Sequence, residues 1–245
     1  MERPADKPGK PPEVPVGKKT ESSSSRFWPR FWWSAAAISL LLGCIFVWRW
    51  PEPPTGKPDP RFQPIDGVTL ASLPLAKRFD MPMGSESGAL VYNAQPFTEN
   101  RHLGDDLNGI GGENTDLGDP VYAIANGRVI YTGWPADGWG NMILVMHAYE
   151  ENGQRCYVQS CYAHLSSIDI ADGEIIRRGQ KIGTVGNAGG KYLAHLHFEL
   201  REFLTPFIGA GYRSNPAGWL NPSQFVQQHR GAAANDMRAE PAIAP

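Results

Sequence analysis

The sequence predicts a mainly β domain, an antiparallel sheet or sandwich, preceded by one N-terminal transmembrane helix. Short runs of alternating or continuous apolar residues recur from residue 81 onward, with turn residues between them and almost no helical periodicity. The chain contains 27 Gly and 22 Pro residues, which is typical of a turn-rich β domain with flexible flanking segments. A single uninterrupted apolar segment lies near the N-terminus and predicts the helix.

The N-terminal region is expected to anchor the chain. Residues 1–30 are rich in Pro, Lys, Ser and Glu and predict a disordered tail. Residues 31–50 are expected to be the transmembrane helix, because Phe31 to Trp48 carries no charged residue and would span about 27 Å. Tryptophans at both ends suit the membrane interfaces. A buried core helix, a cleaved signal peptide and lipidation at Cys44 are the alternatives.

Flanking charges orient this helix. Seven Lys and Arg residues precede it and few follow it closely, so the tail is expected to be cytoplasmic and the rest of the chain periplasmic, at the inner membrane. Residues 51–80 form a Pro-rich linker and lead-in. Residues 81–230 are the expected folded domain, and residues 231–245 the expected disordered C-terminal tail.

The β pattern of residues 81–230 predicts particular elements. Asn126-Gly127 predicts a tight hairpin, and a second strand pair is expected across residues 150–153. Cys156 and Cys161, five apart in one strand, face opposite sides and are not expected to form a disulfide. The expected strands are 121–124, 128–131, 141–147, 155–163, 181–185 and 195–200, and residues 222–228 are expected to form a short helix.

Composition excludes several functions. The chain has 23 Lys and Arg against 25 Asp and Glu, and no basic stripe, so no nucleic-acid partner is expected. A His-Glu-x-x-His helix and a Gly-x-Ser-x-Gly turn are both missing from the sequence. The Gly-rich run 108–118 matches neither a phosphate-binding nor an EF-hand loop, and is interpreted as the rim of a cleft.

Histidine spacing provides the first chemical signal. His195 and His197 lie two apart in an apolar alternation, so on a strand they share one face with Cβ atoms about 6.6 Å apart. His164 is expected at a strand end. Four of the six histidines fall in three short stretches. His147, at another strand end, is interpreted as structural, and His229 is expected to be exposed.

The third stretch is His102-x-Gly104-x-Asp106. In a straight strand His102 and Asp106 would be about 13 Å apart, so a bend at Gly104 is expected to bring them together. Asp105 is the rival carboxylate. Imidazole and carboxylate are usual zinc ligands, and a catalytic zinc takes three protein ligands plus water.

Together, in this order, the three motifs resemble the lysostaphin/LytM-like M23 zinc metallopeptidases over about residues 80–225. The resemblance implies one Zn²⁺ per domain, held by His102, Asp106 and His197, with His164 and His195 as catalytic residues. It also implies an endopeptidase that cuts the peptides of peptidoglycan.

Two alternatives differ in class. Some proteins of this fold bind murein without catalysis and activate a separate cell-wall amidase, and a zinc-dependent scaffold on an envelope assembly is a third reading. Non-catalytic members typically lack some of the five site residues, whereas all five are filled here, which favours the enzyme. Which envelope protein, if any, the N-terminal tail meets stays open.

Overall fold

The computed structural model describes residues 65–86, 88–202 and 208–231. The predicted transmembrane helix, the Pro-rich linker up to residue 64, Cys44 and the C-terminal tail from residue 232 lie outside these ranges. Among the described residues, no helix has the length and apolarity needed to cross a bilayer.

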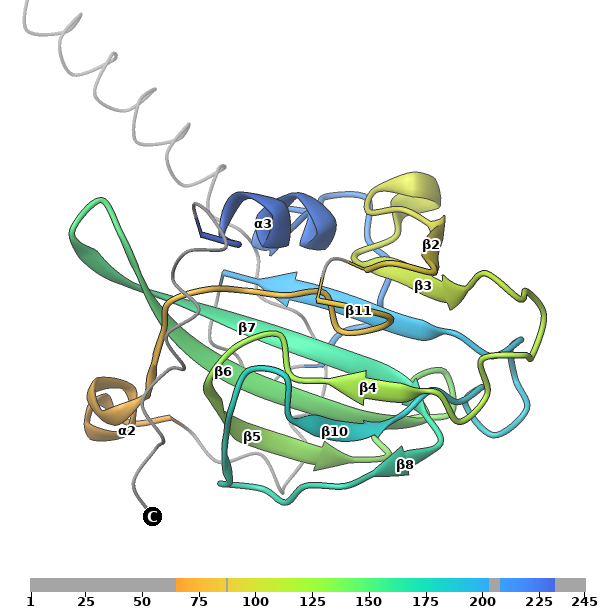
Figure 1. Ribbon diagram of the computed structural model, residues 1–245, viewed down its shortest axis with the longest axis horizontal. Coiled ribbons are helices and arrows are strands. Elements are labelled where there is room, and N and C mark those ends of the chain that lie inside the picture. The colour runs from red at the N-terminus through yellow and green to blue at the C-terminus, as the bar shows by residue number, and fades with distance from the viewer. Residues whose placement is uncertain (1–64, 87, 203–207, 232–245) are drawn as a thin grey trace, which may run out of the picture. The chain divides into compact units, whose positions relative to one another are not determined.

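The main sheet has nine strands and is the frame of the domain (Figure 1). Its central path runs β2-β3-β11-β7-β6-β5-β9, with β12 beside β11 and β1 beside β6. The β1–β6 pairing is parallel, and the other pairings in the described ranges are antiparallel, as predicted. The strands are β1 (Leu75–Ala76), β2 (Val91–Gln95), β3 (Asp105–Gly109), β5 (Gly127–Gly133), β6 (Asn141–Glu151), β7 (Gln154–Leu165), β9 (Ile175–Ile176), β11 (Leu196–Arg201) and β12 (Trp219–Leu220).

A smaller sheet packs on the main one. Its order is β4-β10-β8, formed by β4 (Pro120–Tyr122), β10 (Lys181–Thr184) and β8 (Ser167–Ile168). Figure 1 shows it in front of the long strands. Val121 and Ile182 from this sheet enter the same buried cluster as Ile143, Tyr162 and Phe198 of the main sheet. The apolar faces of the two sheets therefore form one core, and the predicted mainly β, sandwich-like fold is confirmed.

The β6–β7 hairpin is the longest feature of the main sheet. Asn152 and Gly153 connect the two strands with φ values of 52° and 74°. Positive φ at both central residues is the signature of the type I′ turn, whose twist matches that of paired strands. The predicted second hairpin is thus confirmed, with longer strands than the sequence indicated.

The predicted hairpin at Asn126-Gly127 is wrong, because β4 and β5 belong to different sheets. Neither residue has the positive φ that a type I′ turn requires. The Asn126 carbonyl accepts a hydrogen bond from the His147 ring at 2.8 Å instead. Gly127 allows a close approach, since a Cβ there would lie 2.7 Å from Nδ1 of His147. The Asn-Gly pair serves this buried contact rather than a turn.

The lead-in and the C-terminal helix close one end of the core. The lead-in contributes α2 (Gly67–Ser72) and β1, and α3 (Pro222–Gln228) matches the predicted short helix. Phe79 packs edge-on against Phe225, and Phe225 stacks on His229 at a ring distance of 4.0 Å. The prediction that His229 is exposed is wrong, because this stacking half-buries it.

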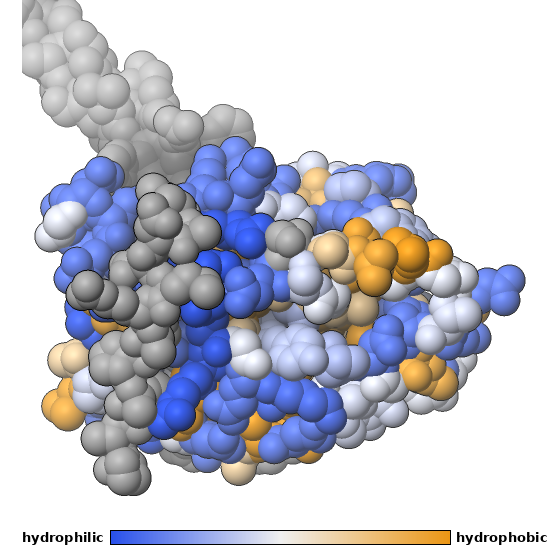
Figure 2. Space-filling model, viewed as in Figure 1, coloured by the Kyte–Doolittle hydropathy of each residue, from blue (hydrophilic) through white to orange (hydrophobic). Residues whose placement is uncertain are grey.

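Two further observations concern the surface and the thiols. Figure 2 shows mostly hydrophilic residues over β4, β8 and β10, and an apolar group over the β2–β3 side. Within the described ranges, Cys156 and Cys161 are both free thiols, as predicted.

Candidate metal centre and cleft

Strand pairing places two of the expected ligands together. β3 pairs with β11 so that Asp106 is directly opposite His197. Paired residues on neighbouring antiparallel strands project to the same face with Cβ atoms about 5 Å apart. Both side chains are almost fully buried at the floor of a cleft.

His102 reaches the same point from a strained loop. It follows a 3₁₀ turn, η1 (Glu99–Arg101), in which Asn100 and Arg101 have φ values of 50° and 69°. Left-handed backbone at non-Gly residues is costly and clusters at functional sites. His102 then forms an antiparallel bridge with Tyr212, which fixes its backbone.

Gly104 lies in the predicted bend between His102 and Asp106. The backbone there does not take a left-handed conformation. A Cβ at Gly104 would lie 2.4 Å from the Phe198 carbonyl oxygen. The chain bends at Leu103 and Gly104, as predicted, and the glycine also permits close packing of the His102 segment on β11.

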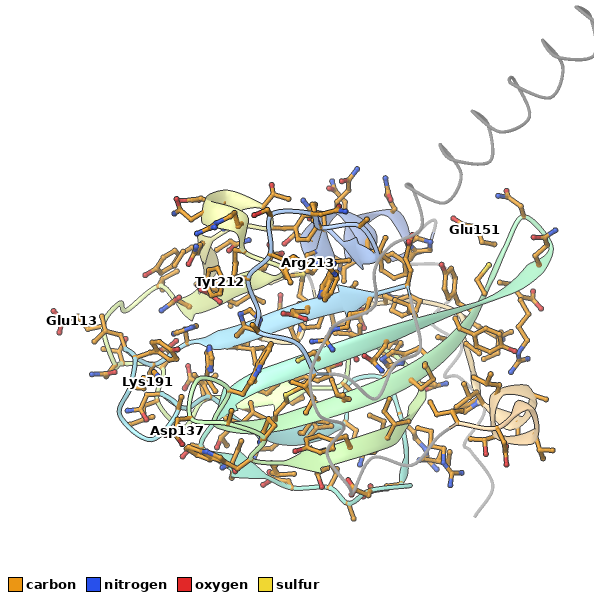
Figure 3. All side chains as sticks on the ribbon, turned by 180° about the vertical axis from the view of Figure 1, so that it is seen from behind. Glu113, Asp137, Glu151, Lys191, Tyr212 and Arg213 are labelled. Carbon is orange, nitrogen blue, oxygen red and sulfur yellow. The ribbon has the colours of Figure 1, made fainter. Side chains whose placement is uncertain are left out.

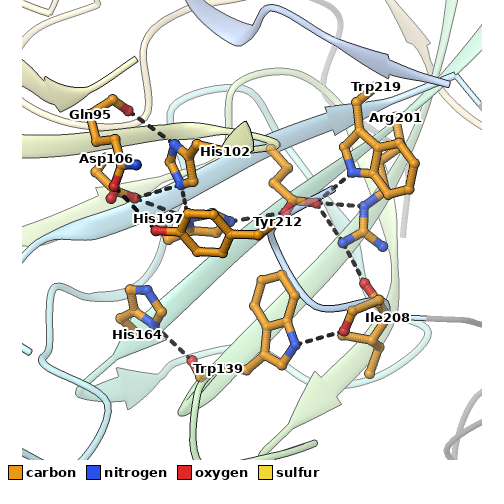
Figure 4. A network of polar contacts seen from close by, with 12 residues as sticks. Gln95, His102, Asp106, Trp139, His164, His197, Arg201, Ile208, Tyr212 and Trp219 are labelled. Atoms are coloured by element: carbon orange, nitrogen blue, oxygen red, sulfur yellow. Dashed lines mark hydrogen bonds and ion pairs between the residues drawn. The ribbon is translucent and has the colours of Figure 1, made fainter. Parts of the chain in front are cut away.

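The three side chains converge on one point (Figure 4). His102 Nε2 lies 2.9 Å from His197 Nδ1 and 3.2 Å from Asp106 Oδ1. His197 Nδ1 lies 3.0 Å from the same oxygen. Ligands of a tetrahedral zinc at about 2.0–2.1 Å are about 3.3 Å from one another, so the three atoms have the spacing of one face of such a site.

Hydrogen bonds on the far side of each imidazole ring indicate which of its nitrogens carries the hydrogen. His102 Nδ1 lies 3.1 Å from the Gln95 carbonyl oxygen and His197 Nε2 lies 3.0 Å from Glu199 Oε1. Both partners only accept, so these nitrogens hold the ring hydrogens. In the neutral rings, His102 Nε2 and His197 Nδ1 then present lone pairs toward the Asp106 carboxylate. Three converging lone-pair donors fit a cation.

The electrostatics of the cluster agree. Burial opposes ionisation of Asp106, but the hydrogen bonds and charges of His102 and His197 outweigh it and lower its pKa. Burial also disfavours a charged His197, yet Asp106 and Glu199 raise its pKa to about 9. At neutral pH without a metal, His197 therefore carries a second ring proton, which a cation bound between the ligand atoms would replace.

The other two predicted site residues lie beside this cluster. His164 is the next-to-last residue of β7 and has a φ of 64°, and its Nδ1 donates to the Trp139 carbonyl at 3.2 Å. His195 precedes β11, and its Nδ1 donates to the Leu193 carbonyl at 2.8 Å. The two rings are 4.7 Å apart, and His195 Nε2 lies 3.7 Å from Asp106 Oδ1. Because each ring donates through Nδ1, its Nε2 carries the lone pair when the ring is neutral.

His164 is held neutral. Burial, followed by the charges of His197 and His195, lowers its pKa to about 3. At neutral pH its ring accordingly carries no charge.

Aromatic side chains enclose the histidines. Trp139 packs against His197 at 5.3 Å, Tyr212 against His102 at 5.1 Å, and Tyr192 against His164 at 4.8 Å. The cavity has a volume of about 550 Å³, within the usual range for ligand sites.

The rim of this cleft is visible from behind the sheet (Figure 3). Glu113 and Lys191 lie on loops at one end of the strands, as does Asp137, and Glu151 lies at the opposite tip of the β6–β7 hairpin. Glu113 belongs to the Gly-rich run 108–118 and lines the cavity, in agreement with the interpretation of that run as a rim.

Several site residues were missed from the sequence. Glu199, Arg201 and Trp219 form a buried polar network behind His197, and Gln95 supplies the carbonyl behind His102. The alternation His197-Phe198-Glu199-Leu200-Arg201 could have indicated the first two, because residues two apart on a strand project to the same face as His197.

Comparison with known proteins identifies the class. The model of peptidase family M23 matches residues 107–216, which include His164, His195 and His197 and begin just after Asp106. Lipoprotein NlpD of Yersinia enterocolitica is 38% identical over 84 residues, 34% of this chain and 78% of the relative. The chain belongs to peptidase family M23, a family of zinc-dependent peptidases involved in peptidoglycan hydrolysis.

Two other relatives differ in their described roles. Murein hydrolase activator NlpD of Salmonella typhimurium is 36% identical over 34% of this chain and 20% of its own length. Lysostaphin of Staphylococcus simulans is 34% identical over 34% of this chain and 16% of its own length. The solved catalytic domain of that lysostaphin is 25% identical, covering 56% of this chain and 90% of that domain, with a TM-score of 0.40. These two relatives are matched over at most a fifth of their length.

Proposed function

We propose that this chain is a zinc-dependent endopeptidase that hydrolyses peptide bonds in peptidoglycan. The observation that carries the proposal is the complete set of donors: His102, Asp106 and His197 converge on one point, beside two histidines that each donate to a backbone carbonyl through Nδ1. A bound zinc would polarise the scissile carbonyl and acidify water.

The proposed roles follow from the ring geometry. His164 lines the cleft and donates through Nδ1 to the Trp139 carbonyl, which leaves its Nε2 to take the proton of the attacking water. His195 presents its Nε2 to the same space from the opposite side of Asp106. Once protonated, either imidazole becomes a donor that stabilises the oxyanion or delivers the proton to the leaving amine.

The test is digestion of purified murein by the full chain in detergent, with mass spectrometry of the products. An endopeptidase generates new peptide amino and carboxyl termini, and the His195→Ala variant is the matched inactive control. Products identical to those of the His195→Ala variant would refute the proposal.

The rival function is activation of a separate amidase, which the name of the Salmonella relative suggests for that protein. An activator would release peptides from glycan strands only when an amidase is added. The five filled site positions favour catalysis by this chain, because an activator needs neither free proton acceptors nor a metal-binding set.

The same proposal places the domain outside the cytoplasm. Two relatives are described as lipoproteins, and we infer a periplasmic domain anchored by the helix expected at residues 31–50. Periplasm-dependent reporter fusions after Pro60 should be active. Labelling of Cys44 by lipid would instead support lipoprotein processing.

A further inference from the structure

β11 carries charge on a face that the fold buries. Phe198 and Leu200 enter the apolar core, whereas Glu199 and Arg201 project to the other side together with His197. Glu199 and Arg201 are both fully buried. Desolvating a carboxylate and a guanidinium is expensive, and replacing such a pair by apolar residues is often neutral or stabilising. Stability alone therefore does not explain why the chain buries the Glu199–Arg201 ion pair.

Both oxygens of Glu199 accept hydrogen bonds. Oε1 accepts the ring hydrogen of His197 Nε2 at 3.0 Å. Oε2 accepts from Arg201 Nε at 2.8 Å, from Arg201 Nη2 at 2.6 Å and from Trp219 Nε1 at 3.0 Å. Three N–H donors, two from Arg201 and one from Trp219, therefore bind one oxygen of the carboxylate, and His197 binds the other.

Arg201 extends this network to the cleft wall. Its Nη2 also donates to the Ile208 carbonyl at 2.8 Å. The next residues are fixed as well, because the Gly209 carbonyl accepts from Trp139 Nε1 and the Gly211 carbonyl from the Leu103 amide. Segment 208–213, which carries Tyr212, is thereby tied to β11 and to the His102 loop.

We propose that Glu199 is a positioning residue for His197, holding the ring in the tautomer whose Nδ1 lone pair faces Asp106 and His102, and that Arg201 locks Glu199 to the cleft wall. Partners of this kind orient metal-binding imidazoles and make them better donors, and their loss typically costs 10–100-fold in metal affinity. This inference rests on the proposed metal site.

The Glu199→Gln variant tests it sharply. The Gln carbonyl oxygen can keep the bonds from Arg201 and Trp219, which turns the amide N–H₂ toward His197 Nε2. A donor there favours the opposite tautomer, with the hydrogen on Nδ1, where the metal should bind. We expect zinc affinity of the full chain, measured by chelator competition, to fall 10–100-fold. The matched control is Glu202→Gln, the same change at a neighbouring exposed residue, with wild-type affinity expected.

A second variant separates positioning from charge balance. Glu199→Gln combined with Arg201→Met removes both buried charges, so the core should remain folded. If Glu199 orients His197, the double variant keeps the loss of zinc affinity and an altered visible spectrum of the Co²⁺-substituted protein. Wild-type affinity in either variant would overturn the inference. Failure of the wild-type chain to bind zinc would instead refute the proposed metal site itself.

Discussion

Gly186 lies opposite His195 in an antiparallel bridge, and its α-carbon also abuts the backbone that follows His164. The His195 amide donates to the Gly186 carbonyl at 3.1 Å. A Cβ on Gly186 would lie 2.3 Å from the His164 carbonyl oxygen and 2.4 Å from the Ser166 amide nitrogen. The relative position of the two proposed catalytic histidines therefore depends on a residue without a side chain.

Replacing Gly186 by Ala should separate these histidines. The obstructing atoms are backbone, so the strands must shift, and overpacking of this kind typically costs about 1–3 kcal/mol. We expect a lower melting temperature and reduced murein hydrolysis, with zinc content retained. The control is Gly67→Ala, where nothing lies within 4 Å of the added atom. Equal stability and activity in Gly186→Ala and wild type would contradict this account.

A second prediction concerns the choice between neighbouring carboxylates. Asp106→Asn, His102→Ala and His197→Ala should each lose zinc, since two protein ligands make a weak site. Asp105→Asn should retain zinc, because Asp105 points away and accepts hydrogen bonds from Ser223 and the Phe97 amide. Elemental analysis after dialysis measures the zinc content of each variant. Zinc loss in Asp105→Asn alone would reverse the assignment.

The sequence was informative where chemistry depends on residue type and order. His102, Asp106, His164, His195 and His197 could be named from three short motifs, and the structure brings all five around one cleft. The alternation of residues 195–200 was also sufficient to place His195 and His197 on a shared side, and both line the cleft. These signals are local.

What the sequence could not reveal depends on distant contacts. The role of Asn126-Gly127 is set by His147, 21 residues after Asn126, and by the separation of β4 and β5 into different sheets. The network behind His197 needs Trp219 and the Ile208 carbonyl, which come from a later segment. A local sequence pattern does not predict which backbone carbonyl will accept a hydrogen bond from which distant side chain.

A third prediction distinguishes the proposed catalysts from the ligands. His164→Ala and His195→Ala should each keep zinc yet hydrolyse murein about 10²–10³-fold more slowly, the range for losing one proton-transfer or oxyanion group. Zinc content and initial rate must be measured on the same preparations. If His195→Ala loses its zinc while His197→Ala retains it, the roles within this pair are exchanged.

The last prediction concerns a histidine far from the metal centre. His147 is fully buried, with Nδ1 bonded to the Asn126 carbonyl and Nε2 at 2.8 Å from Ser160 Oγ. This agrees with its interpretation as structural. Burial lowers its pKa to about 4, against about 6.5 in an unfolded chain. The unfolded state therefore binds the extra proton between these values, so stability from this residue is complete above about pH 6.5 and is lost as pH falls toward 4.

The change that tests this is His147→Gln, whose amide can still donate to the Asn126 carbonyl but does not titrate. Protonation of His147 should remove up to roughly 3 kcal/mol of wild-type stability between pH 7 and pH 4. The variant should be less stable than wild type at pH 7, yet its free energy of unfolding should fall less as the solution is acidified. Urea unfolding at a series of pH values measures both curves. Because other titrating groups and any bound metal are common to the two proteins, they cancel in the difference. Parallel curves would show that His147 does not contribute to acid sensitivity.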